Sequence, residues 1–70
     1  MGSSRPADKT GKVAFISNGE YDVEYDDGGR RHFAKMDVNG SYKVGDRVVV
    51  RAVPAPETVD DWDWVIDHKA

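Results

Sequence analysis

Apolar and polar residues alternate along this chain in the manner of β-strands. The clearest alternation covers residues 20–26, where every second side chain is large and apolar or aromatic: Tyr21, Val23 and Tyr25. The positions between them are acidic. The sequence Asp27-Gly28-Gly29 follows, and it supplies the residues that a short hairpin needs for positive φ. A second strand over residues 30–38 is therefore expected to pair with the first.

The same reading predicts three more strands, over residues 12–17, 47–53 and 62–68. One face of the 47–53 strand holds Val48, Val50 and Ala52, and one face of the 62–68 strand holds Trp62, Trp64 and Ile66. Residues 54–58 contain two prolines and cannot continue a strand, because each proline lacks a backbone N–H. Five short strands with turn signals roughly every 8–12 residues predict an all-β fold, a small five-stranded barrel.

The length of the hairpin loop decides which residues of the second strand point inward. With a two-residue loop, His32 shares a face with the tyrosines, while Phe33 lies on the opposite face between Arg31 and Lys35. The acidic residues then lie opposite Arg31 and Lys35. A three-residue loop exchanges these faces and places Phe33 inside and His32 outside.

Seventy residues make one domain. Residues 1–10 show no periodicity and are expected to be a disordered lead or an expression-vector scar, which leaves residues 11–70 as a single β-barrel domain. So short a chain buries only about 60% of its unfolded surface, so that its stability should be modest. It has no room for a deep active-site cavity beside a core.

Charge and composition exclude several classes of protein. The chain has no cysteine, which rules out disulfides and thiolate metal sites and fits a cytoplasmic location. No apolar run approaches the 18 or so residues of a membrane-spanning helix. The net charge of −3 argues against strong non-specific phosphate binding, but it is compatible with a local basic patch such as Arg30, Arg31 and Lys35 in the predicted strand 30–38.

Most of the chain, from residue 11 to about residue 69, resembles one family of barrels. The resemblance consists of Gly11-Lys12-Val13, a hairpin with Tyr21-Asp22-Val23 and Asp27-Gly28, and the segment 42–50, which reads YKVGDRVVV. These motifs resemble the OB-fold of the ribosomal S-one and bacterial translation initiation factor one type. Residues 39–41 leave no room for the helix that usually joins the third and fourth strands of that fold. The resemblance implies oligonucleotide binding across strands 2 and 3.

The hairpin alone also resembles a second family. Residues 21–28 are similar to the Tyr-x-Val-x-Tyr-Asp-Asp-Gly hairpin of Tudor domains, which are SH3-like barrels. In those domains the hairpin usually comes late, with about two strands before it and one after it. Here one strand precedes the predicted pair and two follow, an order that suits an OB barrel better.

Two sets of residues are candidates for ligand binding. In the nucleic-acid hypothesis Phe33 stacks on a base and nearby cations bind phosphates. The set is Arg30, Arg31, Phe33, Lys35, Arg47 and Arg51. The alternative is that Phe33 only packs beneath a loop while Arg31 and Lys35 pair with the acidic strand.

The second set is an aromatic cage for a methylated cation, with an aspartate as counter-charge. Its members are Tyr21, Tyr25, Trp62, Trp64 and Asp26. The simpler interpretation places both tyrosines in the core, because so small a barrel has few large apolar side chains.

No pattern of catalytic or metal-binding residues accompanies these candidates. His32 and His68 are far apart in sequence and lack a third ligand, so neither a metal nor a cofactor is expected. We therefore expect a monomeric, non-enzymatic module that binds single-stranded nucleic acid. The alternative is a Tudor-like or SH3-like module that recognises a peptide, methylated or not, or a basic protein.

Overall fold

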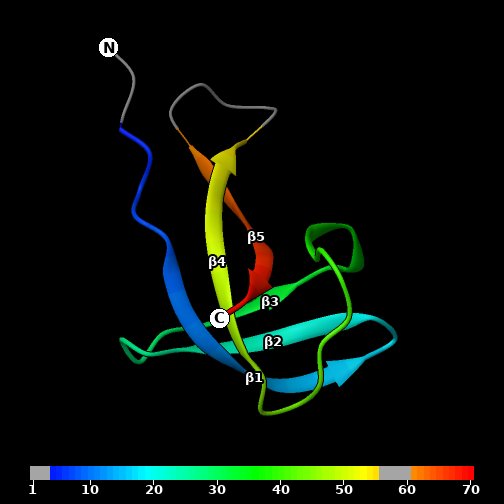
Figure 1. Cartoon of the computed structure of the whole chain (residues 1–70). Coiled ribbons are helices and arrows are strands. Elements are labelled where there is room, and N and C mark those ends of the chain that lie inside the picture. Colours follow the sequence, from blue (N-terminus) through cyan, green and yellow to red (C-terminus); the bar gives the residue numbers. More distant parts are fainter. Residues whose placement is uncertain (1–3, 56–60) are drawn as a thin grey trace.

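The computed structural model describes residues 4–55 and 61–70 and forms a single antiparallel sheet (Figure 1). Within these residues the sheet has five strands and one short 3₁₀ helix. Their bounds are β1 (Lys9–Ser17), β2 (Glu20–Tyr25), β3 (Arg30–Phe33), η1 (Lys35–Asp37), β4 (Arg47–Pro54) and β5 (Trp62–Lys69). The prediction of an all-β fold is confirmed.

The central strand β1 pairs with two partners, so that the strand order is β3-β2-β1-β4-β5. Its first half pairs with β4 and its second half with β2 (Figure 1). Gly11 lies in both pairings, opposite Tyr25 on one side and Val48 on the other. A Cβ atom at Gly11 would lie 2.7 Å from the Glu24 carbonyl oxygen. The strands therefore approach each other here as only a glycine permits.

In the described residues, an isolated bridge links the chain that follows the edge strand β3 to the other edge strand, β5. Val38, just after η1, forms a parallel bridge with Ile66 of β5, and the Asn39 N–H donates to the Ile66 carbonyl at 3.0 Å. No continuous ladder joins β3 to β5 in the described residues. The sheet is curled but is not closed into a barrel.

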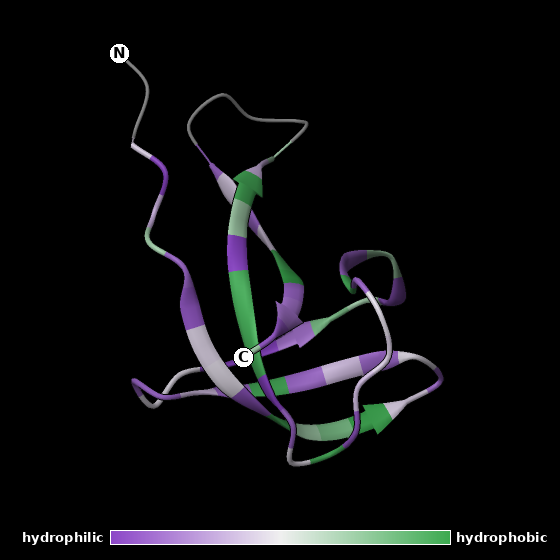
Figure 2. Ribbon diagram, in the orientation of Figure 1, coloured by the Kyte–Doolittle hydropathy of each residue, from purple (hydrophilic) through white to green (hydrophobic). Residues whose placement is uncertain are grey.

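Every strand contributes to one apolar core. Its members are Val13, Tyr21, Val23, Tyr25, Phe33, Val48, Val50, Ala52 and Ile66. The alternation predicted for β4 is confirmed, because all three of its predicted inward residues are buried, and Figure 2 shows the apolar character of that strand. Both tyrosines of β2 belong to the core, as in the simpler interpretation of that strand.

The hairpin of β2 and β3 has a three-residue loop. The Tyr25 N–H donates to the Gly29 carbonyl at 2.7 Å, which leaves Asp26, Asp27 and Gly28 in the loop. Asp27 accepts the Gly29 N–H at 2.9 Å, and Gly28 has a φ of 97°. This local hydrogen bond and the positive φ stabilise the longer loop.

The three-residue loop exchanges the two faces of β3, compared with the arrangement that a two-residue loop would give. Phe33 lies opposite Tyr21 and is 1% exposed, whereas His32 lies opposite Asp22 and is exposed. The two-residue loop, with Phe33 on the outer face, is therefore wrong. The three-residue alternative describes the structure.

A bulge in β1 changes the face of another phenylalanine. The pairing with β2 shifts between Val13 and Phe15, and Ala14 is the extra residue. Beyond the bulge Ile16 packs against the core, and Phe15 points outward with 57% of its surface exposed. An uninterrupted strand would have placed Phe15 on the same face as Val13.

Some expected strand bounds differ from the observed ones. β1 begins at Lys9, so Lys9 and Thr10 of the expected lead are paired with β4. The predicted strand 30–38 ends at Phe33, because the chain turns into η1, where the Asp37 N–H donates to the Ala34 carbonyl at 2.9 Å. Residues 56–58 of the proline-containing segment lie outside the described residues. No helix in the described part of the chain is long and apolar enough to cross a membrane.

The two phenylalanines test this arrangement. Phe33→Ala should lower the free energy of unfolding by about 3–5 kcal/mol, which is enough to unfold so small a domain, because it empties a buried site. Phe15→Ala, the matched control on the outer face, should change it by only about 0.5 kcal/mol. Urea unfolding followed by tryptophan fluorescence measures both. Equal losses for the two variants would contradict the observed faces.

Candidate functional site

The outer face of β1, β2 and β3 consists of rows of side chains that lie opposite one another. One row contains Lys12, Glu24 and Arg30. The next row contains Phe15, Asp22 and His32. This face combines an exposed aromatic ring with charges of both signs.

His32 lies between two carboxylates of β2. Its Nδ1 lies 2.7 Å from Asp22 Oδ1, and its Nε2 lies 2.9 Å from Glu20 Oε1. The hydrogen bond to Asp22, followed by the one to Glu20, raises the pKa of His32, because both bonds favour the doubly protonated ring. Both ring nitrogens are engaged, and the described residues contain no group of three side chains suited to hold a metal ion.

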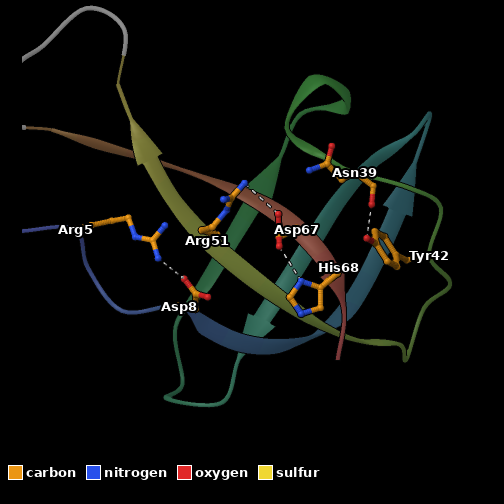
Figure 3. A network of polar contacts seen from close by, with 7 residues as sticks. All are labelled: Arg5, Asp8, Asn39, Tyr42, Arg51, Asp67 and His68. Carbon is orange, nitrogen blue, oxygen red and sulfur yellow. Dashed lines mark hydrogen bonds and ion pairs between the residues drawn. The ribbon is translucent and has the colours of Figure 1, made fainter.

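Two of the predicted phosphate-binding cations are paired with carboxylates. Arg47 Nη2 lies 2.6 Å from Asp26 Oδ2, and Arg51 Nη2 lies 3.2 Å from Asp67 Oδ1 (Figure 3 shows the second pair). Asp26 also accepts the Thr10 hydroxyl at 2.7 Å. The hydrogen bond from Arg47 is the main reason that the pKa of Asp26 is lowered. These arginines neutralise aspartates of the chain itself.

The three predicted cations on β3 and η1 have a different environment. Arg30, Arg31 and Lys35 take part in none of the ion pairs formed among the described residues. Arg31 forms no ion pair because the three-residue loop places it opposite Val23 rather than opposite an acid. The Arg31 guanidinium lies 5.9 Å from the centre of the Phe33 ring and remains exposed. Phe33 itself is covered and cannot stack on a base.

The predicted aromatic cage is only partly assembled. Tyr25 and Trp64 come together around the ammonium of Lys9, which lies 5.0 Å from the first ring centre and 5.5 Å from the second. The counter-charge is Asp27, at 3.4 Å from the ammonium. The sequence did not indicate Lys9, because that residue lies in the segment expected to be disordered.

The other predicted cage members lie elsewhere. Tyr21 packs edge-to-face on Tyr42, with ring centres 5.9 Å apart. Trp62 lies opposite Pro54 at the end of the β4–β5 ladder, and Asp26 is bound to Arg47. The four aromatic residues of the predicted cage therefore do not surround one cavity.

Phe15 is the exposed aromatic residue that sequence reasoning missed. Its outward direction depends on the bulge at Ala14, and no turn or glycine signal in the sequence marks that bulge. It lies in the same row as His32, on the face formed by the hairpin.

Comparison with protein-family models, with curated proteins and with solved structures gives no match to this chain.

The His32 cluster leads to a pH-dependent prediction. Its raised pKa means that the cluster stabilises the fold below about pH 6.5, the ordinary histidine value, and that this stabilisation is lost as the pH rises through the folded-state pKa. Asp22→Asn should move the pKa of His32 back toward its ordinary value. Imidazole proton shifts followed by NMR titration measure the change. An unchanged pKa in the variant would contradict the contact.

Proposed function

We propose that this protein is a small non-enzymatic module that binds single-stranded nucleic acid through β3, η1 and the adjoining outer face of the sheet. The fold proposed with this function is an OB-like, partly open barrel. The observation that carries the proposal is the group of three cations, Arg30, Arg31 and Lys35, which form no ion pair with any carboxylate of the described chain.

The strand order supports the OB-like interpretation. One bent strand shared by two neighbours, with the third and fifth strands at the edges, is the arrangement of a partly open five-stranded Greek-key barrel. The parallel bridge between Val38, just after η1, and Ile66 brings the chain that follows β3 against the edge strand β5. The Asp-Gly hairpin lies at one side of the sheet, after a single preceding strand, which is earlier than in Tudor domains.

The cations follow the edge of the sheet, with Arg30 on the outer face of β3 and Arg31 on the opposite face, beside Phe33. They lie within six consecutive residues at the edge of the sheet, and all three are exposed. Exposed, unpaired cations bind phosphates without first breaking an internal ion pair. Arg47 and Arg51 lack this advantage, so we assign them to the fold and remove them from the proposed binding set.

An exposed ring is available to replace Phe33 as the stacking group. Phe15 lies on the outer face of β1, beside the β2–β3 hairpin. A base stacked on an aromatic ring contributes about 1–3 kcal/mol. Lys12 and Arg30 occupy the adjacent row. The proposed interface therefore combines one stacking ring with a few cations.

The acidic residues of β2 limit the strength of this interaction. Glu20, Asp22 and Glu24 lie on the outer face beside Phe15 and repel phosphates, and the net charge is −3. We therefore expect modest affinity and a shallow salt dependence. Three cations correspond to a slope of about −2 in a plot of log affinity against log salt.

One observation favours a second candidate, a module that reads cationic peptides. Tyr25, Trp64 and Asp27 already hold an ammonium group, that of Lys9. A lysine from a partner would have to displace Lys9, whereas the unpaired cations need no displacement. Nucleic acid is therefore the function that the contacts support better.

The test is a titration with a mixed-sequence single strand of about eight nucleotides, followed by amide NMR shifts at low and high salt. Shifts should centre on residues 12–15 and 30–35 and disappear at high salt. Arg31→Ala should weaken binding about fivefold or more, because it removes a phosphate contact.

Arg51→Gln is the matched control, because Arg51 is already paired with Asp67. It should change the affinity by less than about twofold. No shift in residues 30–35 at low salt, or equal losses for the two variants, would overturn the proposal. Shifts produced by a lysine-rich peptide but not by the oligonucleotide would favour the second candidate.

A further inference from the structure

A small cleft lies where the β1–β2 turn meets the chain that leads from η1 to β4. Its volume is about 210 Å³, and it is lined by Gly19, Tyr21, Lys35, Val38, Gly40 and Ser41. In Figure 1 these segments lie together beside the tip of the β1–β2 hairpin. The cleft is smaller than the roughly 300 Å³ of an ordinary small-molecule site, so it suits one chemical group rather than a whole nucleotide.

The wall of the cleft is held in place from both sides. The Asn39 N–H donates to the Ile66 carbonyl at 3.0 Å, which ties the wall to β5. The Tyr42 N–H donates to the Tyr21 hydroxyl at 3.1 Å, which ties it to β2. The Tyr42 hydroxyl donates to the Asn39 carbonyl and closes the loop between them (Figure 3). The cleft is therefore preformed.

The polar groups that line the cleft are suited to an anion. Among the described residues that line it, Lys35 is the one that carries a charge, and Tyr21 and Ser41 are the ones that carry hydroxyl groups. The Tyr21 hydroxyl accepts the Tyr42 N–H, so its own hydrogen remains available to a ligand. The stem of Lys35 lies 3.4 Å from the position of a Cβ atom on Gly19. A side chain at Gly19 would press on the lysine.

We propose that this cleft binds a terminal phosphate monoester, with Lys35 as the cation and Ser41 and Tyr21 as hydrogen-bond donors. The inference rests on the proposed nucleic-acid function and names the strand end that the site would select. A terminal monoester has a single covalent attachment, so it can enter a small cleft from one side. It also carries about −1.5 to −2 charges, against −1 for an internal diester.

Two ligands distinguish binding in this cleft from binding elsewhere on the surface. Inorganic phosphate should shift the amide signals of residues 19, 40 and 41, and chloride at equal ionic strength should not. A terminal phosphate, 5′ or 3′, should raise the affinity of the oligonucleotide about tenfold over the unphosphorylated strand, because it adds charge-assisted hydrogen bonds. Lys35→Gln should abolish both effects.

Lys43→Gln is the matched control, because it removes the same charge from an exposed lysine of the same loop that does not line the cleft. It should keep both effects. If the plain oligonucleotide binds but a terminal phosphate adds nothing, the inference fails while the proposed function stands. If no oligonucleotide binds at all, the proposed function fails, and phosphate shifts that persist in Lys35→Gln would overturn the cleft as well.

Discussion

The three-residue loop between β2 and β3 is the constraint on which the candidate site depends. Because the loop contains Asp26, Asp27 and Gly28, it sets which side chains of β3 point inward. It buries Phe33, places His32 among the acids and leaves Arg31 opposite an aliphatic residue. A loop one residue shorter would have covered the outer face with internal ion pairs and left a hole in the core.

The bent strand β1 links this hairpin to the other half of the sheet. Gly11 permits the close approach of β2, and the bulge at Ala14 lets Ile16 turn inward while Phe15 turns outward. The same strand begins with Lys9, whose ammonium lies between Tyr25 and Trp64. One strand thus organises the core, the exposed ring and the aromatic contact.

The predictable part of the fold was the part with regular alternation. The strict alternation in β2, and the arginines that mark the outer face of β4, were enough to predict their buried residues, Val23 and Val48 among them. Loop length and bulges add single residues and reverse every face beyond them, so Phe15 and Phe33 could not be placed from the sequence. Ion pairing could not be predicted either, because whether Arg31 meets an acid depends on that same register.

The most direct test of the account is the pairing of β2 with β3 in solution. Because Tyr25 and Gly29 form a hydrogen-bonded pair, Asp22 and His32 form a non-hydrogen-bonded pair, with Cα atoms about 4.5 Å apart. An NMR spectrum of nuclear Overhauser effects should therefore contain a strong contact between the α-protons of Asp22 and His32. A strong α-proton contact that instead joins Val23 to His32, or Glu24 to Phe33, as the two possible two-residue loops would produce, would contradict the register and with it the proposed site.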